Sequence, residues 1–393
     1  MDDKKWLIAF IGIAVLIKIF LFGFAQIHAP QSKFAPDSYL YLNTAKVLVT
    51  KGAFAWADTN GALHEEYRRT PGYPLFLGVL NGLWGIPLSG VVFIQVLLTI
   101  SAAFFVFKTA NEIDPDPRLV FLSAGLILYS PNITVYSLKI LTETLFLLLM
   151  TLYMFNFVRY LKTGAIKYIL VTSCMLVLAA YVRPGAYFLG YATAGFVIYA
   201  NAARDMRRTL YHAIVFLVIM YGLLGIWQLR NYVLFHDAAF TKIFIEYNHF
   251  YTGPSGKIDL VGGVISQMDN YRSTIGRDLL SIMTRPGSLK YFDCPAITIL
   301  GKILGYPLVM FWMAGLLLGI TKIGRNIYFQ FLLFALICIL YGSIVAGTHY
   351  AGERFRVPME PFIAIISAFG WQQLILNKRN RLLGTFGRCE LSK

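Results

Sequence analysis

Repeated apolar runs of about 18 to 22 residues constrain this chain more than any other feature, because each can cross a bilayer core of roughly 30 Å. Within lipid, every backbone N–H and C=O group needs an internal partner, so such runs must be helical. Of the 393 residues, 57% are hydrophobic and only 14% are charged, whereas soluble proteins carry about a quarter charged residues. The sequence therefore predicts an all-α polytopic membrane protein and excludes a pair of soluble domains.

The apolar runs predict about ten transmembrane helices, at 6–27, 89–108, 118–137, 142–161, 167–182, 185–203, 210–230, 299–320, 327–347 and 356–376. Lys4 and Lys5 precede the first run, which lacks a cleavage site and is interpreted as an uncleaved anchor with a cytoplasmic N-terminus. This orientation places three basic clusters in cytoplasmic segments, as the positive-inside rule favours: RDMRR (204–208), KIGR (322–325) and NKRNR (377–381). The net charge of +15 is assigned to these segments and to anionic lipids, and no nucleic-acid partner is expected.

The run 74–88 is apolar but is short for a span and is interrupted by glycine and proline. A crossing there would place RDMRR outside, so we expect a juxtamembrane helix in the outer interface, with Trp84 at headgroup level. The chain is expected to form one integral-membrane domain, 1–393, with three parts outside the bundle: a first external loop at 28–88, a long external loop at 231–298 and a basic cytoplasmic tail at 377–393.

Charged residues gather at the span ends that are predicted to face outward. They lie in the segments APDSYLY (35–41), EEYRRTPGYP (65–74), SLKILTET (137–144), YVRPG (181–185) and THYAGERFRVP (348–358). Charged groups near lipid are costly unless they are paired or face a wet cavity. The clustering therefore indicates a polar site at the outer surface.

Several of these residues also have a simpler structural explanation. Asp37 follows Pro36 and could be the N-cap of a helix over 38–51, which would end at Lys51 before Gly52. Glu143 could cap the next span and complement its dipole. The motif RTPGYP (69–74) could be only a turn, because its proline and glycine favour a sharp bend.

The basic residues likewise have structural alternatives. Arg183 could be an interface anchor, and Arg354 and Arg356 could form a solvated cluster in which Glu353 pairs with one arginine. Lys18, inside the first span, could mark a functional site. It could equally snorkel to the membrane surface or face a neighbouring helix.

A carboxylate and several arginines at the outer leaflet suit an anionic lipid headgroup. Arginine grips phosphate through two parallel hydrogen bonds, and a carboxylate near a hydroxyl can act as a general base. Tyrosines could line a sugar site, namely Tyr39, Tyr41, Tyr67 and Tyr73. These features fit glycosyl transfer from a lipid-phosphate sugar, and they fit a transporter for an anionic lipid equally well.

The sequence shows no pattern typical of a metal site. It has no H-x-x-H spacing, and its six histidines are dispersed, with His349 nearest the charged segments. The four cysteines are scattered without a CxxC spacing, which favours neither a disulfide framework nor a metal centre. We therefore expect no cofactor; a divalent cation is possible but not indicated.

Five features follow one another along the chain: an early Asp in the first external loop, RTPGYPLFL, LTETLF, a span ending in VRP, and ERFRVPMEP before a late span. In this order and topology the chain resembles the GT-C superfamily of integral-membrane glycosyltransferases. The similarity is greatest to the bacterial dolichyl-phosphate-mannose-protein mannosyltransferase-like group (glycosyltransferase family 39-like), which includes lipid A aminoarabinose transferases. It covers about residues 5 to 200 and 300 to 375, and the loop 231–298 matches nothing.

The resemblance implies roles for individual residues. Asp37 matches the catalytic carboxylate of the first external loop, although Ser38 follows it where many eukaryotic members have Glu. Glu143 matches the acidic residue of the second external loop, which helps to shape the site. The remaining assignments are donor or phosphate binding by Arg69, Tyr73, Arg183, Arg354 and Arg356, and site lining by Tyr39, Lys139, His349 and Glu353.

The implied reaction is an inverting transfer of a hexosyl or pentosyl group from a polyprenyl-phosphate sugar to a glycan, lipid or protein acceptor. The resemblance places the enzyme in the cytoplasmic (inner) membrane of a prokaryote, with its site facing outward and both termini cytoplasmic. Two other functions stay open, a transporter or flippase of lipid-linked saccharides and a polymerase of cell-surface polysaccharide. A transporter would be expected to show repeated halves and broken helices, which the sequence does not reveal.

Overall fold

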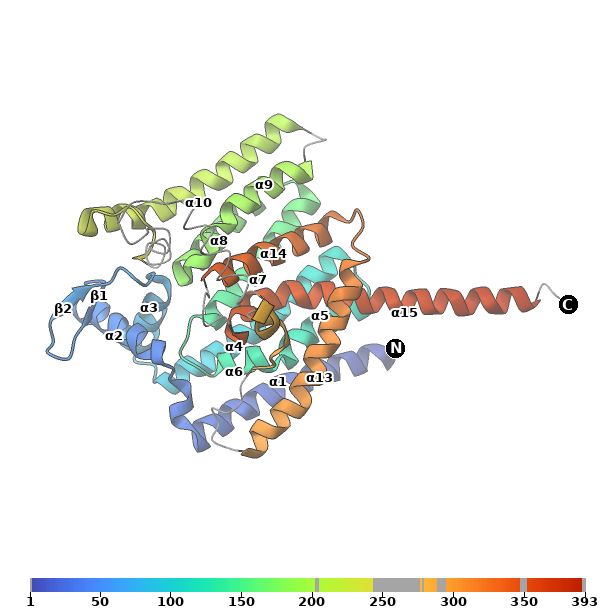
Figure 1. Cartoon of the computed structure of the whole chain (residues 1–393), viewed down its shortest axis with the longest axis horizontal. Helices are drawn as coiled ribbons and strands as arrows, with labels where there is room; N and C mark the ends of the chain where they lie inside the picture. Colours follow the sequence, from blue (N-terminus) through green and yellow to red (C-terminus); the bar gives the residue numbers. More distant parts are fainter. Residues whose placement is uncertain are drawn as a thin grey trace.

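The protein is a bundle of helices in which one end carries a small cap, as the computed structural model shows (Figure 1). The structure describes residues 2–201, 205–242, 276–277, 279–287, 295–346 and 352–390. Long helices form the bundle: α1 (Asp2–His28), α4 (Leu88–Ile113), α5 (Pro117–Tyr129), α7 (Glu143–Thr163), α8 (Ile166–Val182), α9 (Leu189–Asn201), α10 (Met206–Phe235), α13 (Pro295–Ile320), α14 (Ile327–Ala346) and α15 (Glu360–Glu390). Each predicted span corresponds to a helix, so the all-α fold class is confirmed.

Not every helix at a predicted span is long enough to cross a membrane. Within the described residues, six helices are long and apolar enough to cross a membrane, or seven if the bent pair α5 and α6 (Pro131–Ser137) forms one span. Helices α8 and α9 have only 17 and 13 residues. The predicted total of about ten spans is therefore not confirmed.

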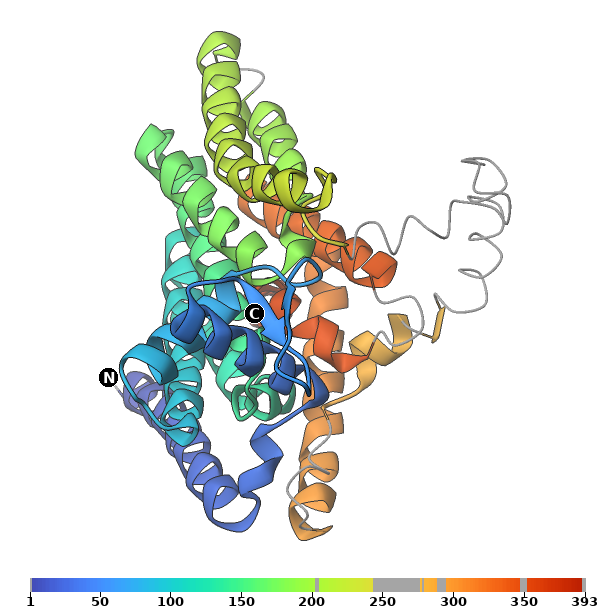
Figure 2. The same cartoon turned by 90° about the vertical axis from the view of Figure 1, so that its left-hand side faces the viewer.

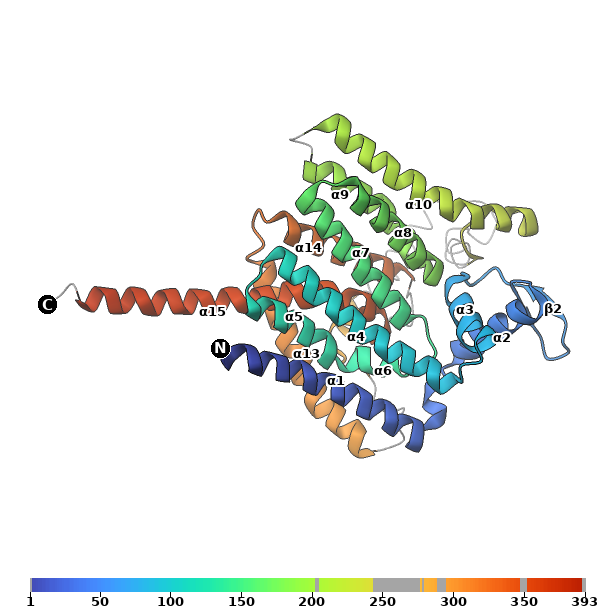
Figure 3. The ribbon, with the colours of Figure 1, turned by 180° about the vertical axis from the view of Figure 1, so that it is seen from behind.

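The helices form two rows, which Figure 2 shows from the capped end. One row follows the order α10, α8, α7, α4 and α1, and the other runs through α9, α14, α15 and α13. Figure 3 shows the first row from behind. Helices α7 and α15 lie in the middle, where α15 also packs on α4, α5 and α7. The N-termini of both central helices therefore meet near the capped end.

The cap is built from residues 30–83, between α1 and α4. It contains the 3₁₀ helix η1 (Pro30–Lys33), α2 (Pro36–Lys51), a two-stranded antiparallel hairpin of β1 (Ala55–Ala57) and β2 (Leu63–Glu65), α3 (Gly72–Leu77) and the π-helix η2 (Gly78–Leu83). The hairpin was not predicted, because its strands have only three residues each. Residues 74–88 do not run through the bundle, and Trp84 is 68% exposed; a juxtamembrane position in the outer interface stays a prediction.

Arg230, near the end of α10, fastens the hairpin to the bundle. Its guanidinium donates to the carbonyl oxygens of Glu66 and Phe54, and to the Glu65 carboxylate. The same group lies 4.7 Å from the centre of the Trp227 ring. These bonds join residues more than 160 positions apart in the sequence and tie the cap to the end of α10.

Lys18 of α1 faces a helix neighbour, which was one of the alternatives from the sequence. It is only 1% exposed, and its Nζ donates to Thr134 Oγ1 of α6 at 2.8 Å. Snorkelling to the membrane surface is therefore wrong for this residue. At the other end of the chain, α15 continues as a helix through the predicted tail as far as Glu390.

Candidate functional site

Asp37 lies in the first turn of α2, but it is not the N-cap. The helix begins at Pro36, and Ser38 Oγ accepts the hydrogen bond from the Ala35 backbone N–H at 2.9 Å. Ser38 Oγ also donates to the Ile140 carbonyl, which ties α2 to the loop before α7. The expected end of α2 at Lys51, with Gly52 in the left-handed region at φ 68°, is confirmed. The carboxylate of Asp37 therefore does not cap this helix.

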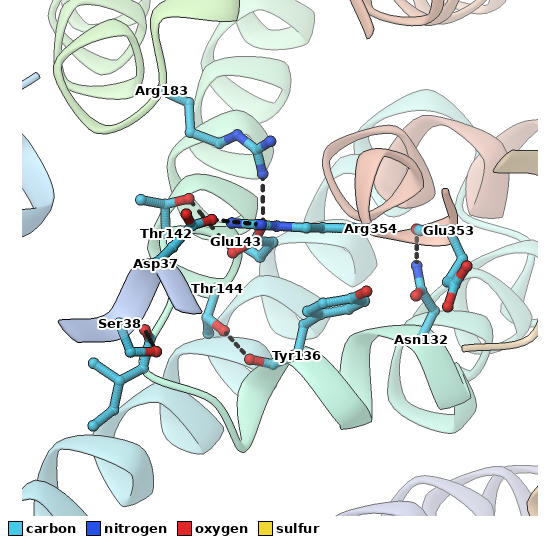
Figure 4. A network of polar contacts seen from close by, with 11 residues as sticks. Asp37, Ser38, Asn132, Tyr136, Thr142, Glu143, Thr144, Arg183, Glu353 and Arg354 are labelled. Atoms are coloured by element: carbon cyan, nitrogen blue, oxygen red, sulfur yellow. Dashed lines mark hydrogen bonds and ion pairs between the residues drawn. The ribbon is translucent and has the colours of Figure 1, made fainter. Parts of the chain in front are cut away.

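The carboxylate of Asp37 pairs instead with Arg354, which lies 317 residues away in the sequence. Arg354 Nη1 donates to Asp37 Oδ2 at 2.8 Å. Arg354 Nε donates to Oε1 of Glu143, the first residue of α7. One guanidinium thus bridges two carboxylates from different helices, α2 and α7 (Figure 4).

Arg183 completes this network, which we call the Asp37 network: Asp37, Glu143, Arg183 and Arg354. Its Nη1 donates to Glu143 Oε1 at 2.9 Å, and its guanidinium lies 5.5 Å from the Phe355 ring centre. Arg183 follows directly on α8 and precedes Pro184, which starts the 3₁₀ helix η3 (Pro184–Ala186). An interface anchor would face lipid, so that alternative is wrong.

Exposure separates the roles of the two carboxylates. The side chain of Glu143 is 0% exposed, whereas that of Asp37 is 40% exposed. The carboxylate of Asp37 is therefore accessible from outside the network. Glu143 is enclosed by the two arginines and orients them, as a buried acid must be paired to stay charged.

Lys139 is a further cation beside this network. It lies in the loop between α6 and α7 and is 3% exposed. Burial lowers the pKa of Lys139 to about 8, and repulsion by Arg354 adds to that effect, while Glu143 and Glu353 raise it. Near neutral pH the lysine therefore keeps most of its charge in the site.

The RTPGYP motif packs beside the network, against Tyr41 of α2 and the end of α8. Tyr73 is fully buried, donates to Gln95 Oε1 at 2.7 Å and packs edge-on against Tyr41. Arg69 pairs with Glu66 and lies 5.6 Å from the Tyr41 ring centre. Burial raises the pKa of Tyr41 above its usual value, and the positive charge of Arg354 opposes part of that rise. Neither Arg69 nor Tyr73 makes a direct bond to Asp37.

Arg356 does not join the Asp37 network. It lies on η6 (Glu353–Met359) and is 0% exposed, with Nε donating to Glu360 Oε1 and Nη1 to the Ile282 carbonyl. The solvated cluster considered from the sequence is therefore wrong for Arg356. The expected pairing of Glu353 with an arginine is also absent among the described contacts.

The other predicted lining residues lie outside the network. Tyr39 is 60% exposed and stacks on Phe34. Glu353 contributes its carbonyl, which accepts from Asn132, and His349 lies outside the described residues. Sequence reasoning missed Asn132 and Gln95, because a buried amide in an apolar run carries no signal of its own. No group of three or more metal-ligating side chains occurs in the parts of the chain that the structure describes.

Comparisons with known proteins point to one fold. The family model of dolichyl-phosphate-mannose-protein mannosyltransferase matches residues 68–227. No curated protein sequence matches the chain. Among solved structures, two relatives are informative because their own ligands are phosphorylated lipids.

The first is the archaeal oligosaccharyltransferase AglB from Archaeoglobus fulgidus, in complex with an inhibitory peptide and a dolichol-phosphate. It has a TM-score of 0.56 at 14% identity, over 98% of this chain and 52% of that one. The second is ArnT from Cupriavidus metallidurans bound to undecaprenyl phosphate, with a TM-score of 0.54 at 12% identity, over 93% of this chain and 60% of that one. The chain thus spans between half and two thirds of their lengths. It shares the fold of these two proteins, which agrees with the resemblance to the GT-C superfamily of membrane glycosyltransferases seen in its sequence.

Proposed function

We propose that this protein is a glycosyltransferase that moves a sugar from a polyprenyl-phosphate donor to an acceptor hydroxyl. One observation carries the proposal: Arg354 joins an accessible carboxylate, Asp37, to a second arginine through the buried Glu143. An accessible carboxylate and two arginines lie side by side, which supports a base next to a pair of phosphate-binding groups. The similarity of fold to proteins solved with dolichol-phosphate and undecaprenyl phosphate supports the donor class.

In the proposed reaction, Asp37 takes the proton of the acceptor hydroxyl as its oxygen attacks the anomeric carbon. The new C–O bond forms on the face opposite the phosphate, the bond from the anomeric carbon to the phosphate oxygen breaks, and the configuration inverts. The transition state is expected to be oxocarbenium-like, as in other glycosyl transfers. The polyprenyl phosphate leaves with its charge.

The arginines would stabilise that leaving charge. The Asp37 network holds two arginines against two carboxylates and is itself neutral, so an incoming phosphate must compete with a carboxylate for Arg354. Of the two carboxylates, Asp37 is the more exposed. We therefore expect the phosphate to displace Asp37 from Arg354 more readily than Glu143. Donor binding would then free Asp37 to act as base, while Arg183 and Lys139 add positive charge. Stabilisation of developing charge by fixed, preorganised groups often contributes more to catalysis than any other single effect.

Substitution of Asp37 by asparagine tests the assignment, because it keeps the shape and removes the base. We expect Asp37→Asn to lose about 10²- to 10⁴-fold in transfer rate, measured with the purified protein and a panel of polyprenyl-phosphate sugars. Asp58→Asn is the matched control, since Asp58 lies in the same cap and its side chain bonds only within the hairpin. Full activity in Asp37→Asn would exclude Asp37 as the base.

Location and acceptor are part of the same proposal. We expect the site to face outward from the inner membrane of a prokaryote, where lipid-linked sugars meet glycan, lipid or protein acceptors of the cell envelope. The assay with a panel of donors would show whether the transferred sugar is a hexosyl or a pentosyl group.

A further inference from the structure

A second polar cluster lies behind the Asp37 network and has no role in the reaction above. It consists of Asn132, Arg356 and Glu360, which we call the rear clamp. All three side chains are nearly or fully buried, with 0%, 0% and 4% exposure. Burying such groups is costly unless they are bonded, so their arrangement calls for an explanation.

The chain places Asn132 behind the site by breaking a helix. Ser130 ends α5 with ψ 117°, and Pro131 starts α6 at an angle of 50° to α5. Proline disfavours helical geometry in the residue before it, which explains the break at this point. The new helix places Asn132 against η6, the segment that carries Arg354.

Asn132 bridges the start of η6 and Glu360, the first residue of α15, which follows η6 directly. Its Nδ2 donates to the Glu353 carbonyl and to Glu360 Oε1, both at 2.8 Å. Figure 4 shows the first of these bonds immediately beside Arg354. Both partners are acceptors, so the amide nitrogen, and not the oxygen, must face them. Glu353 directly precedes Arg354, so the bond fixes the backbone from which the arginine projects.

Arg356 holds the same segment from the other side. Its Nε donates to Glu360 Oε1 at 3.1 Å, its Nη1 donates to the Ile282 carbonyl at 2.6 Å, and its guanidinium lies 4.9 Å from the Trp312 ring centre. Along η6, Arg354 therefore points to the site, whereas Arg356 points into the protein. Arg354 and Arg356 are two residues apart and make their contacts on opposite sides of η6.

We infer that Asn132 is a positioning residue, which holds η6 through Glu353 and Glu360 so that Arg354 reaches Asp37 and Glu143. Arg356 and Glu360 complete this clamp, and neither contacts the substrate. The inference rests on the proposed function for its effect on donor binding, but the position of Arg354 can be measured without any donor.

The first test uses Asn132→Leu, which keeps the branch at Cγ and removes both donated bonds. We expect its affinity for polyprenyl phosphate to fall about tenfold, as loss of buried hydrogen bonds allows. In an Arg354→Ala background the same change should have no further effect, because Asn132 acts through Arg354. Thr144→Val is the control: Thr144 is also buried near the site, but it bonds only to the Tyr136 carbonyl. Unchanged affinity, or an equal loss in the Arg354→Ala background, would overturn the inference.

The second test needs no donor. In a background without native cysteines, Arg354→Cys is titrated with a charged thiol reagent, with and without Asn132→Leu. We expect the reaction rate to change severalfold when the clamp is lost and to stay constant with Thr144→Val. An unchanged rate refutes the positioning role, whether or not the protein binds polyprenyl phosphate. Failure to bind polyprenyl phosphate would refute only the proposed function. If Asn132→Leu does not fold, Asn132→Ala, which removes the amide donor without adding bulk or charge, replaces it in both tests.

Discussion

At the scale of single residues, charge and exposure assign different tasks to chemically similar groups. Asp37 and Glu143 are both carboxylates bonded to Arg354, yet only Asp37 is accessible from outside the network. Arg354 and Arg356 are both arginines of η6, yet one faces the network and the other is enclosed by Glu360 and Trp312. Sequence spacing cannot separate such pairs, because the difference arises from the direction in which each side chain leaves the backbone.

Lys139 leads to a prediction on pH. Because burial and Arg354 lower its pKa to about 8, the lysine is charged below that pH and neutral above it. Affinity for a polyprenyl phosphate should therefore fall severalfold between pH 7 and pH 9, measured by equilibrium binding. Arginine stays protonated throughout this range, so Lys139→Arg should bind with little dependence on pH. A wild-type affinity that does not change over this range would remove Lys139 from the phosphate site.

At the scale of elements, local signals were enough to locate helices but not their partners. Apolar runs predicted the long helices, and Gly52 correctly predicted the end of α2. The bond from Asn132 to Glu353 joins residues 221 positions apart. Arg354 and Asp37 are separated by 317. Nothing in a local pattern specifies such contacts, since they depend on how the two rows of helices pack.

Gly72 shows how one element reaches the site. A Cβ atom at Gly72 would lie 2.7 Å from the Tyr181 carbonyl oxygen and 2.9 Å from the Val182 nitrogen, both backbone atoms of α8. Gly72→Ala should therefore push α3 away from the end of α8, next to Arg183, and destabilise the fold by about 1–3 kcal/mol. The melting temperature in detergent should fall, and transfer activity with it.

Gly185→Ala is the matched control for this change. Gly185 lies two residues beyond Arg183, and an added Cβ there would meet nothing within 4 Å. Its melting temperature should stay close to that of the wild type. If Gly72→Ala is equally stable, then the close approach of α3 to α8 is not needed to hold the cap.

At the scale of the whole molecule, the cap and the termini lie at opposite ends of the bundle (Figure 1). Helix α10 connects the two ends: it begins at Met206 within RDMRR, and its Arg230 binds the hairpin. Its 30 residues give a length of about 45 Å, which exceeds a hydrocarbon core of roughly 30 Å. The arrangement is thus consistent with a cap on one side of a membrane and RDMRR on the other.

This separation predicts the outcome of thiol labelling in intact cells. In a background without native cysteines, Asn60→Cys at the exposed hairpin turn should react with a membrane-impermeant reagent, because we place the cap outside. Arg207→Cys, at the exposed start of α10, should react only after the cells are made permeable, as the positive-inside rule requires of this basic cluster. The reverse pattern would show that the Asp37 network faces the cytoplasm. Labelling of both positions in intact cells would mean that α10 does not cross the membrane.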